Sequence, residues 1–241
     1  MLGKWNDQQS KDRIIIALDC EADKALSIAY QLRKSAKWVK IGMTLYYAYG
    51  DDLVKMLKER GYKVFLDLKF FDIPHQVRGA ARSATLSGAD MLTMHCLGGT
   101  EMMEQACVGI SEAAEVSGSQ VPETLGITVL TSMNDAMLKN IGIERDMASQ
   151  VSHLASLAQM SGLSGVVASP QESSMLRQQL GSDALIVTPG VRPAGADSGD
   201  QSRIATPKQA FLNGASHIVI GRPITGADDP VSAFEKIASE L

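Results

Sequence analysis

The chain has 241 residues, a formal net charge of −4 at pH 7 and a sequence pI of about 5.6. Its Lys and Arg residues are spread along the sequence, which argues against a basic face for nucleic acid. The apolar run at 14–18 is far shorter than the roughly 18 residues of a membrane span, and the polar start does not resemble a signal peptide. The cysteines Cys20, Cys96 and Cys107 form no Cys-x-x-Cys pair. We therefore expect a cytoplasmic protein with reduced thiols, partnered by neither nucleic acid nor membrane.

Short apolar runs recur through the whole chain, and each is followed by a stretch with helical spacing of apolar residues. The eight runs are IIIALD (14–19), WVKIG (38–42), KVFLDLK (63–69), MLTMHC (91–96), LGITVLT (125–131), GVVAS (165–169), ALIVTPG (184–190) and HIVIGR (217–222). Helical patterns between them include 21–36, 50–61, 75–88 and 206–214. Eight such units predict an α/β fold, a single-domain (β/α)8 TIM barrel over residues 1–241.

One segment departs from this regular pattern. Residues 191–203, VRPAGADSGDQSR, follow the seventh apolar run and are rich in Gly, Pro and Asp. A segment of this composition is too polar to pack in a core, and long loops in compact domains are commonly functional. We expect residues 191–203 to form a lid loop.

Charged residues recur at the ends of the first three predicted strands. Asp19 ends the first, Lys40 lies late in the second, and Asp67 and Lys69 end the third. In such barrels the active site lies at the C-terminal strand ends. A purely structural ion pair between Asp67 and Lys69 is the alternative, but a whole ring of alternating charges would cost desolvation for little gain in stability. We therefore interpret the four residues as part of a catalytic site.

The alternation of side chains along a strand places Asp67 and Lys69 on one face of the third strand, together with Phe65. The apolar residues Leu66, Leu68 and Phe70 take the other face and should pack under the helices. Asp67 and Lys69 should therefore point into the mouth of the barrel.

The ends of the last two strands carry features of a phosphate site. Many such barrels bind phosphate with the loops after strands seven and eight. Gly221 allows the backbone to approach a ligand, and Arg222 offers a planar fork of donors for an oxyanion. Arg192 lies at the start of the predicted lid. We expect a phosphorylated small molecule, bound at one end by these residues and acted on at the other by the charged ring.

The stretch DLKFFDIP at 67–74 resembles the Asp-x-Lys-x-x-Asp-Ile-Pro signature of the orotidine 5′-phosphate decarboxylase family. Further similar blocks, in the family's order, are ALD (17–19), VKIGM (39–43), MHCLGG (94–99), TVLTSM (128–133), GVVASPQE (165–172), VTPGVRP (187–193), GDQSRIATP (199–207) and VIGRP (219–223). The resemblance covers nearly the whole chain and is to the bacterial branch. It implies decarboxylation of orotidine 5′-monophosphate to uridine 5′-monophosphate (UMP), the last step of de novo pyrimidine biosynthesis, without a metal or organic cofactor.

The resemblance also implies a role for each matching residue. Lys69 would protonate C6 as carbon dioxide departs, and Asp67 would lie beside the substrate carboxylate. Asp72 and Ile73 would reach into the active site of a second subunit, so that the enzyme would be a homodimer with shared sites. The other substrate contacts implied are Asp19 and Lys40 at the ribose hydroxyls, Thr131 and Ser132 at the pyrimidine, and Arg192, Gln201, Gly221 and Arg222 at the phosphate.

The chain departs from the family pattern at one place. The family usually continues Asp-Ile-Pro with Asn-Thr, and the threonine belongs to the residues lent to the neighbouring site, whereas this chain has His75 and Gln76. We predict that the Gln76 amide replaces the threonine hydroxyl as a hydrogen-bond partner. His75 is expected only to start a helix, and His95 to pack near the site without acting as a base.

Two other functions remain open at this point. Magnesium-dependent decarboxylases and aldolases of keto-sugar phosphates share the barrel and a similar motif, but an acidic metal ligand is typical at the position of Lys40, where a cation would repel Mg²⁺. A catalytically silent barrel that binds a nucleotide and acts through partners is the second alternative, and the filled charged positions argue against it. Motifs of serine hydrolases, zinc proteases and dinucleotide-binding proteins do not occur in the sequence.

Overall fold

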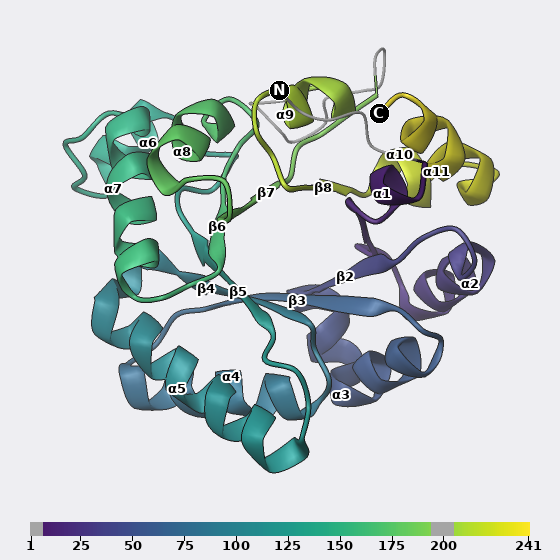
Figure 1. Ribbon diagram of the computed structural model, residues 1–241, viewed down its shortest axis with the longest axis horizontal. Coiled ribbons are helices and arrows are strands. Elements are labelled where there is room, and N and C mark those ends of the chain that lie inside the picture. The colour runs from purple at the N-terminus through teal and green to yellow at the C-terminus, as the bar shows by residue number, and fades with distance from the viewer. Residues whose placement is uncertain (1–6, 194–204) are drawn as a thin grey trace.

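A computed structural model describes residues 7–193 and 205–241. Eight parallel strands form a closed barrel in which each strand pairs with the next and β8 pairs with β1 (Figure 1). The strands are β1 (Ile14–Ala17), β2 (Trp38–Gly42), β3 (Lys63–Phe70), β4 (Met91–His95), β5 (Glu123–Ile127), β6 (Gly165–Val167), β7 (Leu185–Thr188) and β8 (His217–Ile220). The predicted (β/α)8 TIM barrel is thereby confirmed.

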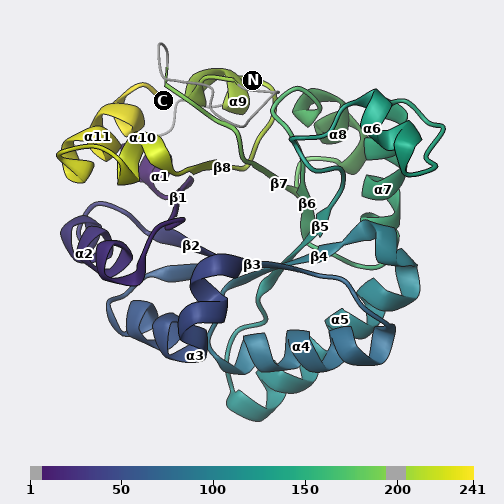
Figure 2. The ribbon, with the colours of Figure 1, turned by 180° about the vertical axis from the view of Figure 1, so that it is seen from behind.

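Helices surround the barrel on its outside, as both views show (Figures 1 and 2). They are α1 (Asp7–Lys11), α2 (Ala22–Leu32), α3 (Met43–Glu59), α4 (Pro74–Leu86), the 3₁₀ turn η1 (Cys96–Gly98), α5 (Gly99–Ser117), α6 (Asp135–Asn140), α7 (Met147–Met160), α8 (Ser173–Leu180), α9 (Pro207–Leu212), α10 (Arg222–Thr225) and α11 (Pro230–Ser239). None of the helices in the described residues is long and apolar enough to cross a bilayer.

The boundaries of several helices follow from local signals in the sequence. Asp146 caps α7 by accepting a hydrogen bond from Ser149 N at 2.7 Å, and α4 begins with Pro74, whose missing N–H costs nothing at a first helical position. The helix expected at 50–61 is only the second half of α3. Gly50, with φ 63° and ψ −151°, interrupts the helical backbone, and the first half begins at Met43.

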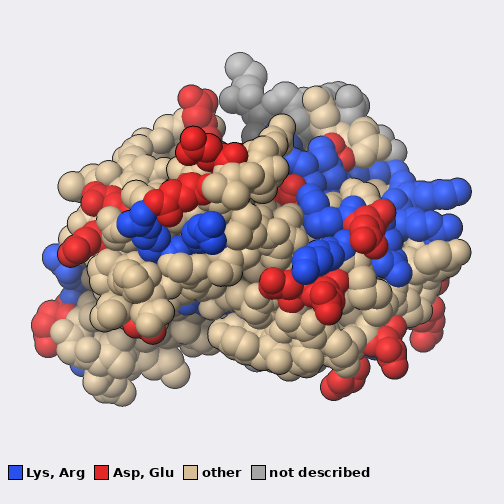
Figure 3. All heavy atoms as spheres, turned by 90° about the horizontal axis from the view of Figure 1, so that it is seen from below, with Lys and Arg blue, Asp and Glu red and all other residues tan. Residues whose placement is uncertain are grey.

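Charged side chains of both signs lie among uncharged ones on the face shown in Figure 3, and cations gather on the right of this view. Cations are dense in the sequence where α2 and α3 lead into the next strands, at Arg33, Lys34, Lys37, Lys58, Arg60 and Lys63. Two of them pair with acids, Lys37 with Asp12 and Lys58 with Asp90, each at 2.6 Å. These turns lie at the N-terminal ends of the strands, away from the strand ends that carry Asp19 and Lys69.

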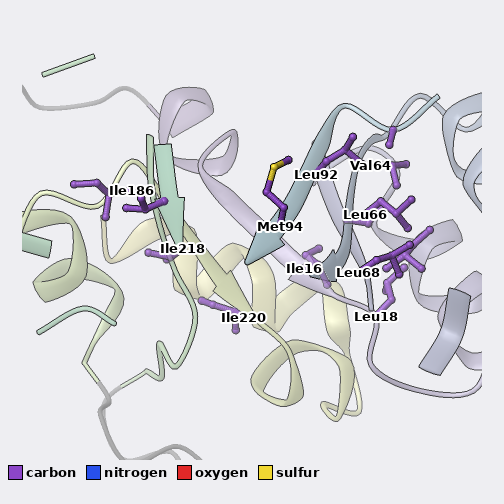
Figure 4. Close-up of a cluster of buried hydrophobic side chains, with 14 of the residues drawn as sticks. Ile16, Leu18, Val64, Leu66, Leu68, Leu92, Met94, Ile186, Ile218 and Ile220 are labelled. Carbon is purple, nitrogen blue, oxygen red and sulfur yellow. The ribbon is translucent and has the colours of Figure 1, made fainter. Parts of the chain in front are cut away.

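The core has two layers that follow from strand alternation. Outward-facing residues of the strands pack under the helices, and Leu66, Leu68 and Met94 are among them (Figure 4). Leu66 is fully buried, Leu68 is 8% exposed, and Phe70 packs against the same cluster, as expected. Inward-facing residues fill the barrel itself: Ile15, Ala17, Trp38, Phe65, Met91, Leu125, Val187 and Val219. Each large apolar side chain buried in this way stabilises the fold by about 1.5–3 kcal/mol.

Candidate active site

A cavity of about 490 Å³ lies at the C-terminal strand ends, which is a typical volume for a small-molecule site. Its apolar lining includes Ala17, Phe65, Ile127, Val129, Val167 and Val219. Its polar lining includes Asp19, Lys40, Asp67, Lys69, Thr131, Ser132, Arg192, Arg222 and Thr225, together with the backbone of Gly221. Residues predicted from distant parts of the sequence therefore meet around one cavity.

The four charged residues of the predicted ring form a chain of alternating sign. Lys40 Nζ lies 3.0 Å from Asp19 Oδ1 and 3.5 Å from Asp67 Oδ2. Lys69 Nζ lies 2.9 Å from Asp67 Oδ1. Asp67 thus binds a different lysine through each of its oxygens, and its carboxylate orients both ammonium groups.

Burial strengthens these interactions at the inner residues. Lys40 and Asp67 are each 8% exposed, whereas the side chain of Asp19 is 61% exposed. Burial acts to raise the pKa of Asp67, but the charges of Lys40 and Lys69 and the hydrogen bonds to its carboxylate hold that pKa below its usual value. Burial acts to lower the pKa of Lys40, but Asp67 and Asp19 raise it above its usual value. Both groups are therefore ionised at neutral pH.

The strand that carries Asp67 and Lys69 is not regular. Leu66 pairs with Leu92 and Phe70 pairs with Met94, so the three residues 67–69 lie opposite the single residue Thr93. Among the described residues Lys69 is the one non-glycine residue with a positive φ, at 53°. A β-bulge of this kind re-aims side chains next to a site. The alternation of side chains correctly predicted that Lys69 faces the cavity. It could not predict the β-bulge and the positive φ of Lys69.

Among the described residues, three of the predicted site residues are not part of the cavity lining. Asp72 and Ile73 lie on the segment between β3 and α4, Gln76 lies in the first turn of α4, and all three are exposed. Ile73 is 63% exposed although its side chain is apolar. The single chain therefore leaves this group at its surface.

The phosphate end of the predicted site is described in part. Arg192 is 9% exposed, and its backbone N–H donates to Ala205 O at 3.0 Å, which connects the described residues before 194 with those after 204. Gln201 and residues 194–203 of the predicted lid lie outside the described residues. An added Cβ at Gly221 would make only an ordinary contact of 3.5 Å with Ala17. Packing within the chain would therefore allow a side chain at position 221. The space beside Gly221 belongs to the cavity and is open to a ligand.

The two histidines near the motif play different structural parts. His75 is exposed in the first turn of α4. His95 ends β4, and its ring centroid lies 5.3 Å from that of Phe71. Burial, with help from the charge of Lys69, lowers the pKa of His95, and its Nδ1 has no hydrogen-bond partner among the described residues. These surroundings favour a packing role for His95 over a role as a base.

The donor groups of the site do not favour a hard metal ion. The described residues contain no group of three or more His, Cys, Asp and Glu side chains placed to hold a metal. The carboxylates of Asp19 and Asp67, which Mg²⁺ would need as ligands, are both paired with Lys40.

Comparison with known proteins places this geometry in a family. The model of the orotidine 5′-phosphate decarboxylase / HUMPS family matches residues 12–237. The chain belongs to this family. The orotidine 5′-phosphate decarboxylase of Moorella thermoacetica is 46% identical over 234 residues, which cover 96% of this chain and 93% of the relative. That of Actinobacillus pleuropneumoniae serotype 5b is 47% identical over 231 residues, covering 95% and 99%.

A solved structure agrees with the sequence relatives. The crystal structure of orotidine 5′-phosphate decarboxylase from Lactobacillus acidophilus matches with a TM-score of 0.84 and 41% sequence identity, covering 95% of this chain and 98% of that one. The resemblance seen in the motifs is thus confirmed over nearly the full length. The chain is an enzyme of this family.

The sequence argument missed several residues at the site. Pro189 and Gly190 line the cavity after β7, and Val129 lines it after β5. Thr93 does not line the cavity but contacts Asp67 and Lys69 from β4. Its only sequence signal is a hydroxyl within the otherwise apolar run MLTM at 91–94.

Proposed function

We propose that this chain converts orotidine 5′-monophosphate to UMP and carbon dioxide, the last step of de novo pyrimidine biosynthesis. The observation that carries the proposal is the Lys69–Asp67–Lys40 chain of ion pairs in a cavity that Arg192 and Arg222 also line. Membership of the orotidine 5′-phosphate decarboxylase / HUMPS family and the names of the relatives support it.

The reaction requires stabilisation of negative charge at carbon. Loss of carbon dioxide leaves a carbanion at C6 with little delocalisation, so the enzyme must lower a high barrier. The ammonium of Lys69, held by Asp67 at 2.9 Å, stabilises this charge and then protonates C6. The Asp67 carboxylate also lies beside the leaving carboxylate and repels it. The scheme uses no metal or organic cofactor.

The rest of the substrate is bound away from the reacting carbon. Arg192, Arg222 and the backbone at Gly221 bind the phosphate, and Gln201 is assigned to the same group. Asp19 and Lys40 bind the ribose hydroxyls, and Thr131 and Ser132 contact the pyrimidine. Binding energy at a remote phosphate can contribute to the chemical step through closure of the 191–203 segment over the ligand.

The enzyme acts as a homodimer with shared sites. Apolar side chains are exposed in elements that follow three neighbouring strands: Tyr47 (76%) after β2, Phe71 (59%) and Ile73 (63%) after β3, and Leu97 (45%) after β4. Exposed apolar surface of this kind is typical of protein interfaces. Asp72 and Gln76 lie in the same exposed region, and in the dimer they complete the neighbouring site.

The decisive assay follows the ultraviolet absorbance of orotidine 5′-monophosphate with the wild type, Lys69→Ala and the control Lys55→Ala, all in EDTA. Lys55 is a surface lysine with 57% of its side chain exposed. We expect rapid loss of absorbance with the wild type and Lys55→Ala and none with Lys69→Ala. No loss with the wild type would contradict the proposal, and keto-sugar phosphates with Mg²⁺ would then be the substrates to test.

A further inference from the structure

Thr93 is fully buried in β4, and its hydroxyl contacts both residues assigned to the chemistry. Thr93 Oγ1 lies 3.0 Å from Asp67 Oδ1, and Lys69 N lies 2.9 Å from Thr93 Oγ1. An ionised carboxylate only accepts hydrogen bonds, and a backbone N–H only donates. The hydroxyl therefore donates its single proton to Asp67 and accepts from the backbone of Lys69, which fixes the direction of both bonds.

The β-bulge explains why a hydroxyl is needed at this position. Residues 67–69 lie opposite Thr93 alone, so the regular pairing of backbone groups between β3 and β4 is interrupted there. Thr93 Oγ1 takes the place of a strand carbonyl as the acceptor for Lys69 N–H. This bond also restrains Lys69 in its left-handed conformation, at φ 53°, which L-residues rarely adopt.

The same hydroxyl completes the set of donors around Asp67. Oδ1 of Asp67 accepts from Lys69 Nζ and from Thr93 Oγ1, while Oδ2 faces Lys40 Nζ at 3.5 Å. Donors on both oxygens prevent the carboxylate from rotating. Connected hydrogen bonds in a site of low dielectric also strengthen one another.

We propose that Thr93 is a positioning residue that holds the Asp67 carboxylate and the backbone of Lys69 in the geometry required for decarboxylation. The inference rests on the proposed function, which it extends by one residue. Thr93 does not line the cavity, so it acts through Asp67 and Lys69 and not by touching the substrate.

The test compares Thr93→Val with Thr93→Ser. Valine keeps the branched shape but removes the hydroxyl, and we expect kcat to fall by about 100-fold, as for other small misplacements of catalytic groups. KM should change little, because the contacts assigned to phosphate and ribose remain. Serine keeps the hydroxyl and should retain most of the wild-type kcat.

Thr124→Val is the matched control. Thr124 is also a buried barrel threonine, and its Oγ1 accepts a hydrogen bond from Ser164 N at 3.1 Å. It lies near the start of β5, at the end of the barrel away from the cavity. The substitution therefore removes the same kind of bond, and we expect a loss of thermal stability without a change in kcat.

A second readout does not depend on turnover. The bond from Thr93 favours the ionised form of Asp67, so Thr93→Val should raise the pKa of Asp67, measured by ¹³C NMR of the aspartate carboxyl groups. Thr124→Val should leave that pKa unchanged. If Thr93→Val does not fold, the smaller Thr93→Ala provides the same comparison.

The outcomes separate this inference from the proposed function. A folded Thr93→Val with wild-type kcat, or with an unchanged pKa of Asp67, would overturn the role of Thr93. A wild-type enzyme that does not decarboxylate orotidine 5′-monophosphate would overturn the proposed function. In that case the titration of Asp67 would still decide whether Thr93 controls its carboxylate.

Discussion

At the scale of single residues, the site depends on a buried carboxylate that serves two lysines. Asp67 contacts Lys40 and Lys69 through different oxygens, and its pKa is held down although burial opposes ionisation. Two ammonium groups so close together would repel each other without it. Sequence alternation predicted that Asp67 and Lys69 share a face, but the pairing with Lys40 depends on the neighbouring strand.

The first prediction concerns Gln76, where the chain departs from its family. Gln76→Ala should lower kcat/KM by about tenfold, the effect of losing one hydrogen bond to the substrate in the shared site. His75→Ala is the control, because His75 is exposed beside it and has no assigned chemistry. Steady-state kinetics of both variants measure the effect. Equal values for Gln76→Ala and the wild type would remove the role of the amide.

The second prediction concerns His217 at the start of β8. Its ring packs edge-on against Trp38 with centroids 5.9 Å apart, and its Nδ1 is buried with no partner among the described residues. Burial, assisted by the charges of Arg13, Lys37 and Lys63, lowers the pKa of His217 from 6.5 to about 4. The folded state therefore resists protonation in a pH range where the unfolded state accepts a proton.

The consequence for stability has a definite sign. The contribution of the neutral His217 to the free energy of unfolding is fully present above pH 6.5. It is lost as the pH falls from 6.5 towards 4, by about 3 kcal/mol in total. Urea unfolding at pH 7 and pH 5, followed by tryptophan fluorescence, measures the loss. His217→Gln should show a flatter pH dependence over this range. The same slope in the variant and the wild type would assign the loss to other groups.

At the scale of elements, the packing of α4 against α5 positions the segment that carries Asp72. Gly109 of α5 faces the backbone of α4, because a Cβ there would lie 2.2 Å from Arg78 O. Arg78 also forms an ion pair with Glu112 of α5. The two helices can approach this closely only where one of them has no side chain.

The third prediction tests this contact. Gly109→Ala should destabilise the protein by about 1–3 kcal/mol, since backbone atoms cannot move aside as a flexible side chain can. Gly79→Ala is the matched control, because Gly79 is exposed in α4 and an added Cβ meets nothing within 4 Å. The control should be neutral or slightly stabilising, since alanine favours helix over glycine. Equal thermal unfolding midpoints for the two variants would contradict this view of the interface.

At the scale of the whole molecule, the cavity and a concentration of cations lie at different ends of the barrel. Lys and Arg residues are dense in the sequence at the turns that lead into β2 and β3. Figure 3 shows cations gathered on one side of the molecule. The opposite end of the barrel carries the cavity and the exposed side chains of Tyr47, Phe71 and Ile73. This end therefore combines the candidate active site with the surface proposed for dimerisation.

The fourth prediction follows from shared sites. Lys69→Ala and Asp72→Ala should each be inactive alone, but a mixture of the two subunits should regain activity. One of the two sites in a mixed dimer contains both residues, so random exchange should give about one quarter of the wild-type rate. The assay mixes the two variants under partly denaturing conditions, refolds them together and then measures decarboxylation. A mixture with no activity, although mixed dimers form, would contradict the sharing of sites.

The sequence alone determined the fold, the family and the position of the charged site. Eight apolar runs with intervening helical patterns predict the barrel, because periodicity reports which face of each element is buried. The motif from Asp67 to Pro74 and the blocks around it predict the family, and the place of Asp19, Lys40 and Lys69 at strand ends predicts a charged site. These features depend on short stretches of chain and on the parallel order of the strands.

Only the tertiary structure decided how the site is held together. The register between β3 and β4 places three residues opposite Thr93, and the left-handed Lys69 follows from that register. Asp67 pairs with both Lys40 and Lys69, and Ile73 is exposed. Both features likewise depend on residues far away in the chain. The physical reason is that alternation within a strand is a local property, whereas pairing, bulges and burial are set by contacts between strands.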